Sequence, residues 1–120
     1  MEKPHKKLDV WKLSMDLVTA IYKLTDNFPE KEIYCLTNQI RRAAISIPSN
    51  IAEGAARNTK REFVNFLHIA QGSLSELDTQ IEIAKKLGYL KENDWKSLDE
   101  VMIRIDKMLS GLINNVKRKA

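Results

Sequence analysis

Residues 59–88 read TKREFVNFLHIAQGSLSELDTQIEIAKKLG, and this stretch contains the clearest helix start in the chain. Thr59 and Glu62 have the spacing of a capping box, in which two side chains satisfy free backbone N–H groups. Gly88 is a typical helix stop. The pattern predicts a helix over residues 60–87, roughly 40 Å long, and Gly72 in its middle predicts close approach of a neighbouring helix. The apolar seam follows a heptad spacing: Phe63, Leu67, Ala70, Leu74, Leu77, Ile81 and Ala84.

Segments on both sides of this stretch also have helical periodicity. We expect helices over residues 9–26, 30–55 and 93–117, joined by short connections. Pro48 lies inside the second helix, where it predicts a kink but not a stop. Short connections place neighbouring helices antiparallel. The sequence therefore predicts one all-α domain over residues 1–120, an antiparallel up-down-up-down four-helix bundle with a kinked second helix.

The helix expected over residues 9–26 has apolar residues on two roughly opposite faces. One stripe contains Trp11, Met15, Val18 and Tyr22, and the other follows Leu13 through Leu24. An outer helix of a small bundle buries one face, so the second face predicts a partner surface, most simply another copy of the chain. The candidate interface residues are Leu13, Leu17, Ala20, Ile21 and Leu24, with Ile69 and Ile83 on the helix over residues 60–87.

The net charge of +4 conceals an uneven distribution of charge. In the expected topology, the start of the first helix, the connection between the second and third helices, and the end of the fourth share one end of the bundle. A ring of such subunits would multiply the positive charge of that end and attract polyphosphate. The basic residues expected there are Lys3, Lys6, Lys7, Lys12, Arg57, Lys60, Arg61, Lys117, Arg118 and Lys119, against the acidic Glu2, Asp9, Glu53 and Glu62.

Six of these basic residues are the best candidates for nucleic-acid binding. The alternative is that they form an ordinary solvated helix end. No aromatic residues interleave with them, so any binding should use phosphate contacts and not base stacking. The six are Arg57, Lys60, Arg61, Lys117, Arg118 and Lys119.

Arg41 and Arg42 are further candidates, in the middle of the second helix. Adjacent helical residues point about 100° apart, so both cannot face one partner equally. One reading has at least one of them lining a channel or contacting phosphate. The other has it paired with a carboxylate on a neighbouring helix or subunit.

Pro48 leaves the carbonyl of Ala44 without its helical donor, and polar side chains follow directly. Ser49, Asn50 and Glu53 form either a polar binding pocket or a network that holds the kink and the helix register.

Several classes of protein are excluded by motif and composition. His5 and His68 are isolated from other ligands at metal-binding spacing, so we expect no metal site. No phosphate-binding loop, carboxylate pair or catalytic triad is present, so we expect no catalytic residue and no cofactor. No apolar run has the length of a membrane span. The single Cys35 fits a reducing compartment, which predicts a cytoplasmic protein.

Residues 39–54, QIRRAAISIPSNIAEG, resemble the signature of bacterial four-helix-bundle proteins encoded in 23S rRNA intervening sequences. Val10-Trp11, Phe28-Pro29, Gly72-Ser73-Leu74 and residues 85–90 extend the resemblance over nearly the whole chain. The family includes accessory proteins of diversity-generating retroelements, which partner a reverse transcriptase and its RNA. The resemblance implies a closed bundle that assembles as a ring-like homopentamer with a central channel, and it implies no catalytic activity.

Two functional hypotheses follow from these observations. In the first, a non-enzymatic homo-oligomer binds nucleic acid, in particular structured RNA, through its basic end and acts as an accessory factor. In the second, the assembly is a scaffold that docks a partner protein such as a reverse transcriptase and has no direct role with nucleic acid.

Overall fold

The computed structural model describes residues 3–119, which form four long helices, two short 3₁₀ turns and no strand. The all-α, four-helix fold class is therefore confirmed. The described chain is elongated, with extents of 46 × 23 × 22 Å. Its elements are η1 (Pro4–Lys7), α1 (Asp9–Thr25), η2 (Glu30–Glu32), α2 (Leu36–Ala55), α3 (Lys60–Lys86) and α4 (Glu92–Arg118). None of the helices described for residues 3–119 is long and apolar enough to cross a membrane.

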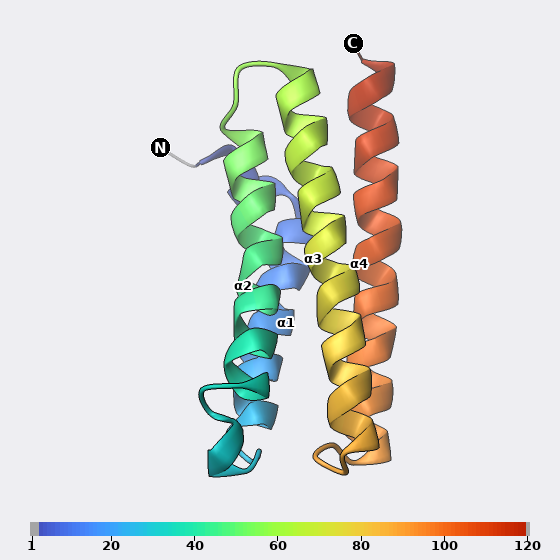
Figure 1. Ribbon diagram of the computed structural model, residues 1–120. Coiled ribbons are helices and arrows are strands. Elements are labelled where there is room, and N and C mark those ends of the chain that lie inside the picture. Colours follow the sequence, from blue (N-terminus) through green and yellow to red (C-terminus); the bar gives the residue numbers. More distant parts are fainter. Residues whose placement is uncertain (1–2, 120) are drawn as a thin grey trace.

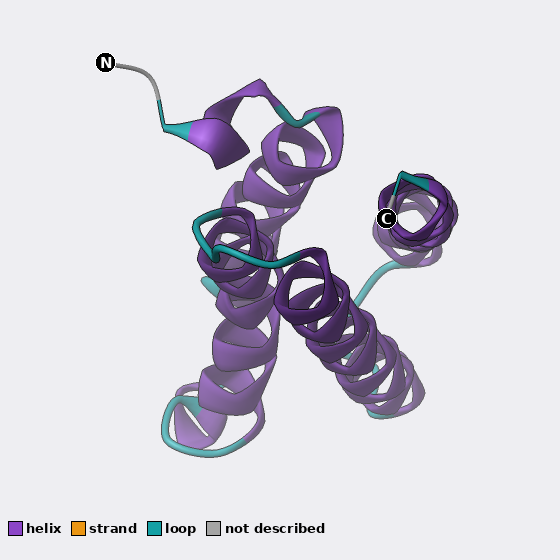
Figure 2. Cartoon of the chain, turned by 90° about the horizontal axis from the view of Figure 1, so that it is seen from above, coloured by secondary structure: helices purple, strands orange, loops and turns teal. Residues whose placement is uncertain are grey.

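The helices occupy four corners of a bundle. Figure 1 shows α1 running downward, α2 returning upward, α3 running downward and α4 ending at the top, so the connections alternate between the two ends. α1 contacts α2 and α4, and α3 contacts the same two helices. Seen from above in Figure 2, the loop between α2 and α3 faces the viewer at the same end of the bundle as the end of α4.

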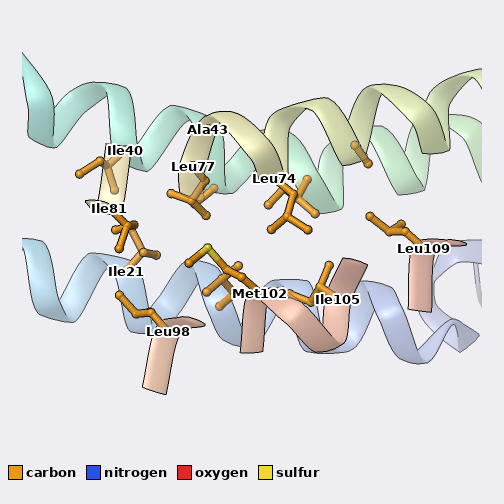
Figure 3. Packing of buried hydrophobic residues seen from close by; sticks show 14 of the residues in the cluster. Ile21, Ile40, Ala43, Leu74, Leu77, Ile81, Leu98, Met102, Ile105 and Leu109 are labelled. Carbon is orange, nitrogen blue, oxygen red and sulfur yellow. The ribbon is translucent and has the colours of Figure 1, made fainter. Parts of the chain in front are cut away.

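The core is built from one apolar stripe of each helix. The heptad seam of α3 is buried from Leu67 to Ala84, while Phe63 at its start is half-buried. Figure 3 shows Leu77 and Ile81 of α3 converging with Ile21 of α1 and with Met102 of α4. Burying each large side chain of this core contributes roughly 1.5–3 kcal/mol, so the buried stripes of the four helices together supply most of the stability.

The buried face of α1 differs from the predicted one. Leu17 and Ile21 are 1% and 0% exposed, so both belong to the core of the single chain and not to a surface between copies. The buried stripe also includes Ser14 and Thr25, whose hydroxyls donate to the backbone oxygens of Val10 and Ile21, both over 2.7 Å. Because these hydroxyls are satisfied inside the helix, polar residues occupy core positions that an apolar periodicity does not reveal.

The second helix also begins later than predicted. Pro29 precedes the short turn η2, and α2 starts only at Leu36. Glu32 explains the arrangement, because its Oε1 atom accepts from the Leu36 N–H over 3.5 Å and its Oε2 atom accepts from the Tyr89 hydroxyl over 2.8 Å. Ile33, inside the predicted helix over residues 30–55, lies before α2 and is 50% exposed. The bounds of α1, α3 and α4 differ from the predicted ones by one residue at most at each end.

The close approach between helices occurs at a different glycine from the one predicted. Nothing lies within 4 Å of a Cβ placed on Gly72, whereas a Cβ on Gly54 would lie 2.7 Å from Phe66 Cβ. Gly54 is in the last turn of α2, which continues without a stop through Pro48. The missing side chain at Gly54 is therefore what lets the end of α2 lie against the start of α3.

Candidate nucleic-acid interface

The start of α3 is held by the predicted capping box. Thr59 Oγ1 accepts from the Glu62 N–H over 3.1 Å and donates to Glu62 Oε1 over 2.8 Å. The carboxylate thus bonds the Thr59 hydroxyl, where the usual motif has it reach the backbone N–H. This cap places Lys60 and Arg61 in the exposed first turn of α3.

Lys60 and Arg61 of α3 meet Lys117 of α4 at one hollow. These three cations and Val64 line a space of about 270 Å³, which we call the basic hollow. Within residues 3–119, none of the three has a carboxylate within 4.0 Å of its charged nitrogens. Arg61 and Val64 also border a neighbouring hollow of about 450 Å³ that reaches His68. The structure therefore brings together cations from the middle and from the end of the sequence that face solvent and have no counter-ion within the described residues.

Arg57 differs from these cations. Its guanidinium lies 3.7 Å from Glu53 Oε1 and 4.9 Å from the centre of the Phe66 ring. Both contacts hold the side chain along the bundle, and the carboxylate offsets its charge. Arg57 is therefore a weaker candidate for phosphate contact than Lys60 or Arg61.

The terminal basic residues are distributed unevenly. Arg118 ends α4 and Lys119 follows it, both exposed at the same end as the basic hollow. Lys3, Lys6 and Lys7 flank or lie in η1, which packs against α1 and α2. In Figure 1 this segment lies below the loop between α2 and α3, since α1 has 17 residues and α3 has 27. Glu2, expected at this end, lies outside the described residues.

Arg41 and Arg42 lie away from the basic end. Arg41 Nε donates to Thr25 Oγ1 over 2.9 Å, its Nη2 donates to Asp26 Oδ1 over 3.0 Å, and its guanidinium lies 4.5 Å from the centre of the Tyr22 ring. These contacts tie α2 to the end of α1. Arg42 is exposed on the outer side of α2 and has no carboxylate partner within residues 3–119.

The polar network at Pro48 has a different membership from the predicted one. Asn50 Nδ2 donates to the Ser46 backbone oxygen over 2.8 Å and to Ser46 Oγ over 2.9 Å, and Ser46 Oγ lies 2.7 Å from Ser73 Oγ of α3. Ser49 is exposed, and Glu53 is turned toward Arg57. The prediction that Ser49 and Glu53 belong to this network is therefore wrong. Asn50 bonds Ser46, which in turn contacts Ser73 of α3, and the sequence pattern does not show that α3 packs there.

The predicted interface residues fall into three groups. Leu13, Ala20 and Leu24 are half-buried and line a groove of about 250 Å³ between α1 and α4, together with Leu98 and Val101. Ile69 and Ile83 are exposed on α3, outside this groove. The third group is the buried Leu17 and Ile21 described above. The five residues outside the core remain candidates for contact with a partner.

Comparison with known protein families shows the family of this chain. A sequence model of the family described as "23S rRNA-intervening sequence protein" matches residues 6–111. The chain belongs to this family. The match includes both α2, with its signature, and the cap of α3 that presents Lys60 and Arg61.

A solved structure has the same fold as this 23S rRNA-intervening sequence protein. It is a protein of unknown function from the S23 ribosomal protein family of Bacteroides thetaiotaomicron VPI-5482, with a TM-score of 0.80 and 24% sequence identity. The alignment covers 88% of this chain and 95% of that chain. At this identity the likeness shows the fold alone. A search of curated proteins finds no match.

The sequence did not predict a hollow between α3 and α4 that is lined by carboxylates. Between α3 and α4 lies a hollow of about 400 Å³, and burial raises the pKa of its Asp78, with Asp99 and Glu82 raising that pKa further. Asp99 and Asp106 are seven residues apart and so share a face of α4, a spacing that the sequence contains. Their approach to Asp78 of α3 depends on the packing of two helices, which the sequence alone does not show. We call this hollow the acidic groove, and the residues used below are Leu74, Asp78, Asp99, Met102, Ile103 and Asp106.

The described side chains give no basis for a metal centre. Within residues 3–119, no group of three or more His, Cys, Asp or Glu side chains is placed to hold a metal ion.

Proposed function

We propose that this member of the 23S rRNA-intervening sequence protein family is a non-enzymatic accessory factor that binds structured RNA through its basic end. The observation that carries the proposal is the basic hollow, where Lys60, Arg61 and Lys117 converge without a carboxylate partner in the described chain. Cations so arranged suit phosphate oxygens, and none of the residues that line the basic hollow is aromatic, which favours contacts with the backbone over contacts with bases.

The proposal includes self-association of the up-down-up-down bundle into a ring-like homo-oligomer, in which the family resemblance implies five copies. One copy offers only a few phosphate contacts. A ring that gathers several basic hollows on one side would raise affinity through many simultaneous contacts.

The test is a salt series with a labelled RNA hairpin. Phosphate-led binding predicts that log affinity falls linearly with log salt concentration. The variant Lys60→Gln/Arg61→Gln/Lys117→Gln should bind more weakly and have a flatter slope. A matched control is Lys31→Gln/Lys86→Gln/Lys91→Gln, which removes the same charge at the opposite end of the bundle and should keep the slope. Undetectable binding at low salt, or equal slopes in the two variants, would refute the RNA proposal.

A second candidate function is docking of a partner protein, such as a reverse transcriptase. It is favoured by apolar side chains exposed at the end opposite to the basic hollow, where Ile33, Tyr34 and Leu87 are 50%, 89% and 54% exposed. Capture of partners from the native host, with and without nuclease, separates the two functions. A partner that is retained after nuclease treatment and lost from Tyr34→Ser/Leu87→Ser supports docking, whereas loss of all partners on nuclease treatment contradicts it.

A further inference from the structure

Two side-chain contacts between α3 and α4 flank an opening between these helices. On one side of the opening, Gln71 Nε2 donates to Ser110 Oγ over 3.0 Å. On the other, Trp95 Nε1 donates to Glu82 Oε1 over 2.9 Å, and Lys85 Nζ lies 3.5 Å from the centre of the Trp95 ring. The acidic groove occupies the interval between these pairs, so it is an opening flanked on both sides by contacts between α3 and α4.

The acidic groove has carboxylates without cations. Within residues 3–119, Asp78, Asp99 and Asp106 have no Lys, Arg or His nitrogen within 4.0 Å, although Lys107 lies on the rim. Ile103, between two of these carboxylates on α4, is 48% exposed. Crowded carboxylates around an exposed apolar side chain are complementary to an apolar surface that carries a cation.

A surface of that kind lies on the opposite side of the same chain. A groove of about 370 Å³ between α1 and α2 is lined by the apolar side chains of Trp11, Met15, Val18, Ile45 and Pro48, with no carboxylate among its lining residues. Met15 and Ile45 are each 40% exposed. Arg42, exposed and without a carboxylate partner in the described chain, precedes Ile45 by three residues and so lies on the same side of α2. We call the lining residues and Arg42 the α1–α2 surface.

We propose that the α1–α2 surface of one copy docks into the acidic groove of a second copy, with Arg42 facing the carboxylates and Ile45 and Met15 packing against Ile103. The inference rests on the self-association proposed above and adds which two surfaces meet. α2 and α4 are the neighbours of both α1 and α3, so α1 and α3 lie diagonally across the core and the two surfaces lie on opposite sides of the bundle. Pairing the acidic groove with its own copy would oppose like charges. The contact is therefore head-to-tail, which is the kind of contact that a ring requires, and the ring closes when the rotation between successive copies completes a full turn.

Two variants that each block one surface test this arrangement. Met15→Asp/Ile45→Asp blocks the α1–α2 surface, and Ile103→Asp blocks the acidic groove; all three positions are exposed, so the fold should tolerate the changes, which circular dichroism checks. By sedimentation velocity, each variant alone should have the mass of a single chain. An equimolar mixture should form a dimer and nothing larger, because each variant keeps one intact surface that fits the intact surface of the other.

The outcomes separate this inference from the proposed function. Single variants that keep the wild-type assembly size, or that fall apart but do not form a dimer when mixed, overturn the head-to-tail contact and leave self-association through another surface. A monomeric wild-type protein overturns the contact and the proposed ring together. Hairpin binding by the wild-type protein is scored separately in the salt series, so a failure of RNA binding leaves the contact standing.

A charge exchange tests the role of Arg42. Arg42→Glu should raise the concentration at half-assembly by about tenfold or more, and adding Asp99→Arg in the same chain should recover most of the loss. Lys31→Glu makes the same charge change in η2, outside both surfaces, and should leave the midpoint unchanged. Equal effects of Arg42→Glu and Lys31→Glu, or no recovery with Asp99→Arg, would refute the pairing.

Discussion

Gly54 lies so close to Phe66 that a Cβ on Gly54 would sit 2.7 Å from Phe66 Cβ and 3.0 Å from Phe63 Cδ1. The Phe66 Cβ and the Phe63 backbone oxygen, which would lie 3.2 Å away, are fixed by the α3 backbone and cannot swing aside, so α2 and α3 would have to separate. Gly54→Ala should lower the free energy of unfolding by about 1–3 kcal/mol, since overpacking outweighs the better helix propensity of alanine.

Gly72 provides the control for this prediction. It is exposed inside α3 with nothing within 4 Å of a built Cβ. Gly72→Ala should raise the free energy of unfolding by about 0.5–1 kcal/mol. Urea denaturation measures both variants, and a Gly54→Ala protein as stable as Gly72→Ala would show that the helices are not in close contact there.

Arg41 should contribute more to stability than its ion pair suggests. Asp26 is 75% exposed, so Asp26→Asn should change the free energy of unfolding by less than about 1 kcal/mol. Arg41→Ala also loses the hydrogen bond to Thr25 and the contact with the Tyr22 ring, and should cost about 1–2 kcal/mol. Equal costs for the two variants in chemical denaturation would assign the whole effect to the ion pair.

Thr37 offers a way to increase stability. Its side chain is 3% exposed, and its Oγ1 atom has no hydrogen-bond partner in the described chain. Because a buried polar group without a partner lowers stability, Thr37→Val should raise the free energy of unfolding by about 1 kcal/mol. Thr25→Val is the contrasting variant and should lower the free energy of unfolding, because the Thr25 hydroxyl donates to the Ile21 backbone oxygen and accepts from Arg41. Destabilisation by Thr37→Val would indicate that its hydroxyl is bonded in solution.

Tyr89 should make stability depend on pH in the alkaline range. The hydrogen bond from its hydroxyl to Glu32 raises the pKa of Tyr89 above its ordinary 10.0, with desolvation and the negative charge of Glu32 adding to the shift. The folded state therefore favours the neutral phenol, so this stabilisation is complete below pH 10 and is lost as the pH rises through the raised pKa.

The variant Tyr89→Phe isolates that effect. Its Tm should be lower than that of the wild type below pH 10, and the difference should shrink above that pH. Tyr34→Phe is the control, because Tyr34 is 89% exposed, and it should leave the Tm profile of the wild type in place. A constant Tm difference across the alkaline range would exclude the Glu32 hydrogen bond as its cause.

Local pattern was enough to predict the bounds of α1, α3 and α4 to within one residue and to predict one feature of the candidate interface. The heptad from Phe63 to Ala84 and the cap at Thr59 placed α3 to within one residue, because side-chain spacing and capping chemistry act over one or two turns. The same cap puts Lys60 and Arg61 in an exposed first turn. For these features, the information lies in neighbouring residues.

Features that depend on two distant segments could not be predicted in this way. Ser14 and Thr25 lie in the core because their face of α1 points inward, and their hydroxyls donate to backbone oxygens of the same helix. The later start of α2 goes with the hydrogen bond between Glu32 and Tyr89, and Tyr89 lies in the loop between α3 and α4. The close helix approach fell at Gly54 and not at Gly72, because α3 placed Phe66 there.

The division has a physical basis in the range of the interactions. Periodicity, caps and charge spacing are local, so the primary structure settles which segments become helices and which cations stand at their ends. The rotation of each helix about its axis and its partner across the bundle depend on packing between segments far apart in the chain. That packing brought Lys117 to Lys60 and Arg61, and Asp99 and Asp106 to Asp78.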